Sequence, residues 1–179
     1  MEGRSRAHEA YLVEPGHNDP VTQRIDGIKK LLASPQAMRV GMNLWPPFLG
    51  AGIRIEEFAE DWSRVRVRLT KSRLTSNYFG TAYGGSLFSM TDPFFAILTL
   101  RRLGPGYVVW DQAGEIEFLA PGRTTVRTTI EIPDEFIVEL KEAAASGEKV
   151  LRWLECDLTD TSGTVIARVR KQLYVRRKR

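Results

Sequence analysis

The stretch Asn77–Leu103, NYFGTAYGGSLFSMTDPFFAILTLRRL, lies at the centre of this chain's organisation. It opens with glycines at positions 80, 84 and 85, which let the backbone bend tightly into a helix. Apolar residues then cover most of a helical surface, and a helix that is apolar nearly all round is normally enclosed by its domain. These residues are Leu87, Phe88, Met90, Phe94, Phe95, Ile97, Leu98 and Leu100. We therefore predict a buried central helix from about Ser86 onward.

One carboxylate, that of Asp92, falls within this apolar helix. No Lys or Arg precedes it within two helical turns, and the first one after it is Arg101. A buried, unpaired carboxylate is costly, so we expect Asp92 to be protonated, hydrogen-bonded or functional. Pro93 cannot donate a hydrogen bond to the Ser89 carbonyl and should kink the helix. Asp92 and Pro93 also suit the N-cap and first position of a new helical segment, so a capping role for Asp92 stays open.

The segments around the central helix predict strands. Val65, Val67 and Leu69 alternate strictly with three arginines, which is typical of a half-buried antiparallel strand with a charged outer face. Five more strands are expected at 53–58, 107–120, 126–132, 149–160 and 165–176, with a short helix at 134–145. This order predicts an α+β fold, in which antiparallel strands wrap one central helix.

The region before the first strand predicts helices. Residues 1–20 are expected to form an extended, mobile leader, because they contain no apolar run and are interrupted by prolines and glycines. Residues 21–41 favour two short helices divided at Pro35, the second ending at Gly41, and an apolar loop follows. The chain is thus divided into a leader (1–20), N-terminal helices with a loop (21–49) and one folded domain (50–179).

Composition excludes several classes of protein. The sequence has one cysteine, which rules out an internal disulfide and fits a reducing cytoplasm. No apolar run is long enough to span a membrane, and no nucleic-acid-binding module is found. The net charge of +4 owes much to the basic residues at 168–179. That segment is either a solvated tail or a site for an anionic partner, such as the phosphates of a nucleotide-bearing cofactor.

The histidine content narrows the possible chemistry. The two histidines, His8 and His17, both lie in the predicted leader. A Ser-His-Asp or Cys-His arrangement needs a histidine in the folded body, and so do the usual Cys/His zinc sites. An enzyme built on this chain would therefore work with carboxylates, amides, hydroxyls and backbone N–H groups.

The residues at 77–92, N-Y-F-G-T-A-Y-G-G-S-L-F-S-M-T-D, resemble the signature of hotdog-fold acyl-CoA thioesterases of the phenylacetate and hydroxybenzoyl type. That signature is Asn, two residues, Gly-Thr, any residue, His-Gly-Gly, then Asp seven positions on, and every spacing is kept. A weaker match is I-E-F-L-A-P-G at 116–122. The resemblance covers roughly residues 50–176. It implies a hotdog fold, an antiparallel sheet wrapped around a long central helix, to which the N-terminal helices are an addition.

The resemblance also implies roles for individual residues. Asp92 matches the catalytic carboxylate, which activates water or attacks the thioester. Gly84 matches the residue whose backbone N–H points at the thioester carbonyl, and Asn77 matches an amide that helps to hold substrate or water. The unpaired N–H groups of a helix's first turn suit a developing oxyanion, and a desolvated carboxylate with a raised pKa is a usable base. The expected substrate-binding residues are Phe79, Thr81, Tyr83, Gly85 and Phe94.

Structural alternatives remain for several of these residues. Tyr83 stands where the family has histidine, and a phenol with a pKa of about 10 donates hydrogen bonds but does no acid–base work at pH 7. Asn77 would also suit an Asx turn, and Gly84 and Gly85 would suit close helix–sheet packing. With these substitutions, the chain resembles an uncharacterised branch of the superfamily.

Two functions are therefore expected. The first is hydrolysis of an acyl-CoA or acyl-carrier thioester, with the coenzyme A ester as substrate and no further cofactor. The second is a non-catalytic module on the same fold that binds acyl thioesters or serves assembly. The resemblance also implies a homodimer or a dimer of dimers with sites between protomers, and no nucleic acid or membrane partner is expected.

Overall fold

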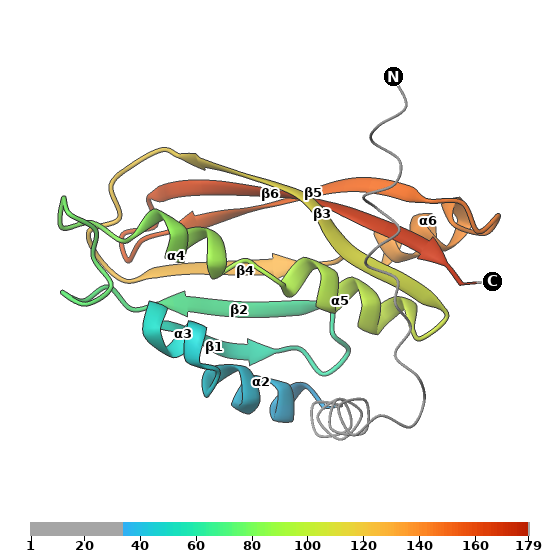
Figure 1. The fold of residues 1–179 in the computed structure, drawn as a ribbon, viewed down its shortest axis with the longest axis horizontal. Coiled ribbons are helices and arrows are strands. Elements are labelled where there is room, and N and C mark those ends of the chain that lie inside the picture. The colour runs from blue at the N-terminus through green and yellow to red at the C-terminus, as the bar shows by residue number, and fades with distance from the viewer. Residues whose placement is uncertain (1–33, 179) are drawn as a thin grey trace, which may run out of the picture. The chain divides into compact units, whose positions relative to one another are not determined.

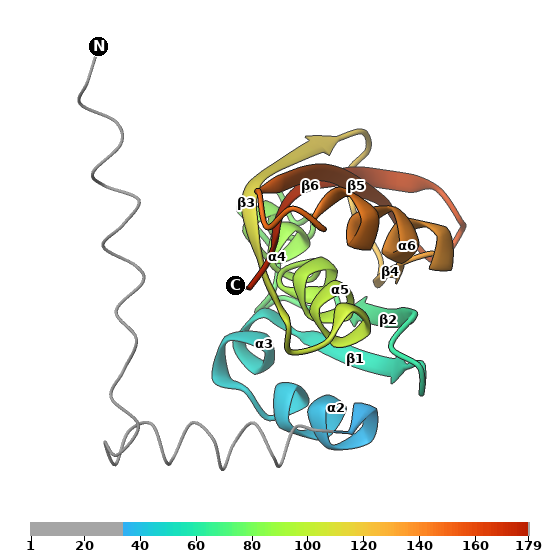
Figure 2. The ribbon, with the colours of Figure 1, turned by 90° about the vertical axis from the view of Figure 1, so that its right-hand side faces the viewer.

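The computed structural model describes residues 34–178, in which a six-stranded antiparallel sheet curls around two consecutive helices (Figures 1 and 2). The helices are α2 (Pro35–Asn43), α3 (Pro46–Ala51), α4 (Gly84–Ser89), α5 (Phe94–Leu103) and α6 (Asp134–Ala143). The strands are β1 (Ile53–Phe58), β2 (Arg64–Leu69), β3 (Tyr107–Phe118), β4 (Val126–Glu131), β5 (Val150–Thr159) and β6 (Val165–Arg177). Their order in the sheet is β1-β2-β4-β5-β6-β3. The predicted α+β hotdog architecture and its strands are confirmed. The predicted leader and the first predicted helix lie outside the described residues.

The central helix is divided into α4 and α5. Helix α4 ends at Ser89 and α5 begins at Phe94, as Pro93 predicted, since proline has no N–H for the helical ladder. The peptide bond between Asp92 and Pro93 is cis. Phe94 is fully buried, and its ring centroid lies 6.0 Å from that of Phe48 and 5.9 Å from that of Phe58. The break therefore leaves Asp92 between two helices that remain part of the core.

The N-terminal helices differ from the prediction in two ways. The segment expected to be an apolar loop contains α3, because Pro46 and Pro47 stand at the start of a helix, where proline's fixed φ is favourable. Helix α2 continues past Gly41 to Asn43. The Asn43 side chain then bonds to β1: its Nδ2 donates to the Ile55 carbonyl (3.0 Å), and the Ile55 N–H donates to its Oδ1 (2.7 Å). Thus α2 lies against the outer edge of β1.

The two edges of the sheet differ. The outer edge of β1 is bonded by Asn43, whereas β3 has β6 as its one neighbour within residues 34–178. Residues 112–115 of β3 are exposed, and so is Phe118 near its end. The open edge of this sheet is therefore β3.

None of the described helices has the length and apolar character that crossing a membrane requires.

Cys156 offers a test of how tightly the sheet closes around the core. Its side chain is buried on β5, and this burial raises the pKa of the thiol to about 11. Since the thiolate is the reactive form, we expect folded protein at pH 8 not to react with a thiol reagent. Protein unfolded in urea should give one thiol per chain, because the sequence has one cysteine. Rapid labelling of the folded protein would contradict the buried position.

Candidate functional site

A cavity lies where the two stretches of the family resemblance meet. The Ala82 N–H donates to the Gly122 carbonyl (2.8 Å), which joins the loop before α4 to the segment after β3. The cavity has a volume of about 440 Å³. It is lined by Asn77, Thr81, Ala82, Gly84, Leu87, Phe118, Leu119, Ala120, Pro121 and Gly122. Three of the predicted site residues, Asn77, Thr81 and Gly84, thus share one lining.

Close packing accounts for both glycines at the start of α4. A Cβ atom on Gly84 would lie 2.8 Å from Cζ of Phe118, so the phenyl ring needs a glycine beneath it. A Cβ atom on Gly85 would lie 2.5 Å from Cε1 of Tyr83. The Tyr83 ring therefore covers Gly85, while most of that side chain remains exposed. Gly84 serves helix–sheet packing and also lines the cavity.

The Asn77 side chain closes its own loop. Its Oδ1 accepts hydrogen bonds from the backbone N–H groups of Phe79 (3.0 Å) and Thr81 (3.1 Å), and its Nδ2 donates to Thr81 Oγ1 (2.9 Å). This is the Asx-turn arrangement that the sequence left open. Asn77 and Thr81 shape the wall of the cavity, and the role of either one toward a substrate stays a prediction.

The two phenylalanines among the predicted substrate-binding residues lie in different environments. The Phe79 side chain is 81% exposed at the loop before α4. Phe94 is fully buried between Phe48 and Phe58 and does not line the cavity. Phe94 is therefore a core residue, because the break at Pro93 starts a new helix that faces inward.

Asp92 lies apart from the lining of this cavity and is neither buried nor unpaired. Its side chain is 52% exposed, and its Oδ1 accepts a hydrogen bond from Lys171 Nζ at 2.6 Å. The expectation of an isolated, desolvated carboxylate is therefore wrong, because the fold brings β6 alongside the helix break. The capping alternative finds no support either, since the N-cap of α5 is Pro93 and not Asp92.

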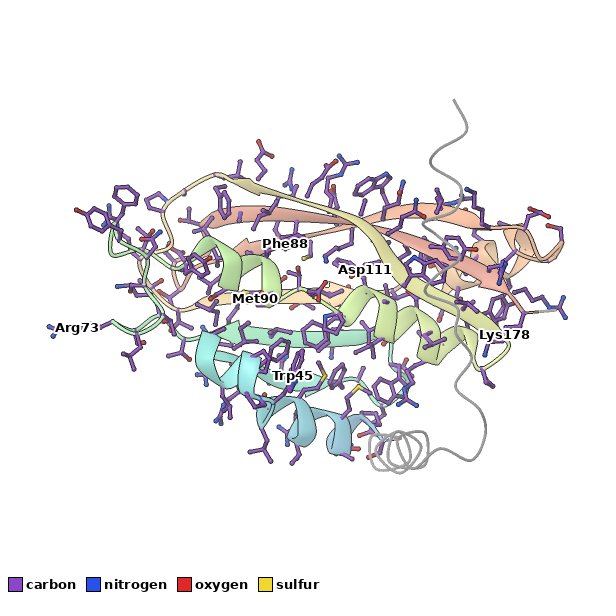
Figure 3. The ribbon with its side chains drawn as sticks, in the orientation of Figure 1. Trp45, Arg73, Phe88, Met90, Asp111 and Lys178 are labelled. Atoms are coloured by element: carbon purple, nitrogen blue, oxygen red, sulfur yellow. The ribbon has the colours of Figure 1, made fainter. Side chains whose placement is uncertain are left out.

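The buried Lys171 lies at the centre of a group of contacts, which we call the Lys171 cluster: Lys171, Asp92, Asp111 and Phe88. The Lys171 side chain is 5% exposed. Its Nζ lies 3.3 Å from Asp111 Oδ2 and 4.4 Å from the centroid of the Phe88 ring. Figure 3 labels Phe88 on α4 and Asp111 on β3, close to the break between α4 and α5. One ammonium group thus contacts two carboxylates and an aromatic face.

Asp111 is the more enclosed of the two carboxylates. Burial raises the pKa of its carboxyl, while the ammonium of Lys171 acts in the opposite direction and the charge of Asp92 adds to the rise. Its Oδ1 is buried and has no hydrogen-bond partner among the described residues.

No group of three His, Cys, Asp or Glu side chains within residues 34–178 is placed to hold a metal ion.

Sequence reasoning missed Lys171, which it grouped with the basic residues near the carboxyl end. The alternation of inward and outward residues along β6 indicated that Lys171 is buried. Ala167, Val169, Leu173 and Val175 form the buried face of the strand, and Lys171 falls in the same phase. A lysine at an inward position of an antiparallel strand needs a partner, and that requirement indicates a buried ion pair.

Comparisons with known proteins agree with this fold. The model of a family described as "Domain of unknown function (DUF4442)" matches residues 35–175. A Pseudomonas aeruginosa protein of unknown function, described as a probable thioesterase, is similar with a TM-score of 0.71 and 23% identity, over 79% of this chain and 95% of that one. The Escherichia coli PaaI protein from the phenylacetic acid degradation operon has a TM-score of 0.55 and 20% identity, over 79% and 91%. A search of curated proteins finds no match.

At these identities the likeness to solved structures shows a common fold and leaves the activity to be tested. The family match is more extensive, because it runs from the first residue of α2 almost to the end of β6. Helices α2 and α3 are therefore part of the family's domain. With most of its length covered by that one model, the chain belongs to the DUF4442 family and has the hotdog fold.

Proposed function

We propose that this protein hydrolyses an acyl thioester carried on coenzyme A or on an acyl-carrier protein. The observation that carries the proposal is the exposed Asp92 carboxylate, at the break in the central helix and at the position that matches the catalytic carboxylate of the thioesterase signature. The cavity beside α4 supports it, because both stretches of the resemblance line that cavity. The side chains of Leu87, Phe118 and Leu119 give part of its lining the apolar character that suits an acyl group.

In the proposed reaction, Asp92 accepts a proton from water as the water oxygen attacks the thioester carbonyl. The carbonyl oxygen becomes an oxyanion, and a backbone N–H group near Gly84 is suited to stabilise it. When the tetrahedral intermediate collapses, the carbon–sulfur bond breaks, and the thiolate takes up the proton to leave as a free thiol. A carboxylate that alternates between base and acid is sufficient for this sequence of steps.

We further propose that two copies of the chain complete each site. Asp92 does not line the cavity of its own chain. In this arrangement the cavity of one protomer holds the acyl group, and the second protomer supplies the carboxylate. The open edge of β3 suits such pairing, because an unpaired strand edge can accept a strand of the partner. We expect sedimentation at micromolar concentration to give a dimer or a dimer of dimers, and a monomer would contradict this arrangement.

A screen of acyl-CoA esters tests the proposed function directly. Purified protein is incubated with esters of increasing chain length and with aromatic acyl groups, and released thiol is measured with a chromogenic reagent. Cys156 should add no background, because it is buried. Turnover above the no-enzyme rate with at least one ester is expected, and Asp92→Asn serves as the matched control. No turnover with any ester would overturn the proposal.

A non-catalytic acyl-thioester binder is the second candidate. It is favoured by the Asn77 amide, since both ends of that group are already used within its own loop. This candidate predicts saturable binding of a non-hydrolysable acyl-CoA analogue without turnover of the matching ester. Calorimetry with the analogue, performed beside the hydrolysis screen, separates the two functions.

A further inference from the structure

The Lys171 ammonium is a buried charge that the proposed reaction does not itself use. A buried cation is costly unless it is paired, and here it contacts both Asp92 and Asp111. Its alkyl chain passes Gly114, where a Cβ atom would lie 3.0 Å from Lys171 Cδ and 2.7 Å from Phe88 Cζ. A side chain at that position would displace either Lys171 or the ring. The packing therefore fixes the lysine along its length.

Asp92, by contrast, has little else to hold it. It lies between α4 and α5, outside the hydrogen-bonded ladder of either helix. Its side chain is exposed, and its Oδ1 accepts a hydrogen bond from Lys171 Nζ at 2.6 Å. One oxygen of this exposed carboxylate is thus anchored by a buried cation.

We propose that Lys171 is the positioning residue for Asp92, an inference that rests on the proposed thioesterase function. By anchoring Oδ1, the ammonium sets the plane of the carboxylate and leaves Oδ2 to meet the water or the thioester. Asp111 and Phe88 hold Lys171 in turn. The cluster therefore restrains Asp92 at a break in the central helix, where no helical hydrogen bonds restrain it. Loss of such orientation typically lowers a rate by about 10²-fold, without a loss of binding.

The test compares four proteins: the wild type, Lys171→Met, Lys171→Met with Asp111→Asn, and Arg170→Met. Methionine keeps an unbranched apolar side chain, one atom shorter than that of lysine, without the charge. Lys171→Met alone leaves the buried Asp111 carboxylate without its cation, which should lower stability. The added Asp111→Asn change removes that unpaired charge. Arg170 is the matched control, because it is the next residue of β6, is exposed, and pairs with Glu115 outside the cluster.

For each protein, kcat and KM are measured with an ester that the wild type hydrolyses, and Tm is measured alongside. We expect both Lys171 variants to lose about 10²-fold in kcat with an unchanged KM, because binding does not depend on the orientation of Asp92. The double variant should regain Tm but not kcat, and Arg170→Met should keep the wild-type kcat. Recovery of kcat together with Tm would show that Lys171 serves stability alone and would overturn the proposal.

A double-mutant cycle with Asp92 completes the test. If Lys171 acts through Asp92, then Lys171→Met should lower kcat no further in a protein that already contains Asp92→Asn. An independent loss of the same size in that background would overturn the positioning role. A wild type that hydrolyses no ester would overturn the proposed function, and this role with it. An active wild type whose Lys171 variants are equally active would overturn the positioning role alone.

Discussion

Asp92→Asn is expected to lower the turnover of an acyl-CoA ester by about 10²–10⁴-fold, the usual range for losing a positioned acid–base group. The amide has nearly the shape of the carboxylate and can still accept a hydrogen bond from Lys171 through its oxygen, so the fold should be kept. The amide accepts no proton from water, and the chemical step therefore fails. Steady-state kinetics and thermal unfolding of the same preparation measure both effects.

Asp157→Asn is the control for that variant. Asp157 is a partly exposed carboxylate that also bonds a cation, since its Oδ1 lies 2.7 Å from Arg168 Nε. It is located on β5 and belongs neither to the cavity lining nor to the Lys171 cluster, so its loss should leave kcat unchanged. Asp92→Asn with the wild-type kcat would end the mechanism proposed here.

Phe94→Ala is expected to cost about 3–5 kcal/mol in the free energy of unfolding, as large-to-small changes of buried aromatic residues do. Its ring is fully buried and contacts Phe48 and Phe58, so the cavity left behind has neighbours on several sides. Urea unfolding measures the loss. Phe79→Ala is the matched control, because the Phe79 ring is exposed and its removal should change stability by no more than about 0.5 kcal/mol. A loss below about 1 kcal/mol for Phe94→Ala would contradict its place in the core.

Much of this fold could be predicted from local patterns. The alternation of Val65, Val67 and Leu69 with arginines predicted β2 because inward and outward residues of a half-buried strand differ in polarity. Pro93 predicted the break between α4 and α5 because the missing N–H acts locally. Helix α3 was missed, since its segment was expected to be an apolar loop, although Pro46 and Pro47 both suit the first turn of a helix.

The charges of the candidate site were harder to predict, because they depend on contacts between distant parts of the chain. Lys171 is 79 residues from Asp92, and the sequence neighbourhood of Asp92 contains no cation that indicates the pair. The spacing from Asn77 to Asp92 predicted which residues belong near the site, but not their surroundings. Whether a carboxylate is isolated or paired depends on which strand the sheet places beside it, and local spacing does not contain that information.

The Asn43 amide also affects how many copies of the chain can associate. By bonding the backbone of Ile55 on both its N–H and its carbonyl, it opposes strand addition at β1, so that within residues 34–178 β3 is the edge that remains free to extend the sheet. If two copies pair β3 with β3, their joined sheet ends in a blocked β1 at each side and offers no free edge to a third. One side chain on a short helix would thereby make the assembly self-limiting and prevent polymerisation through the sheet.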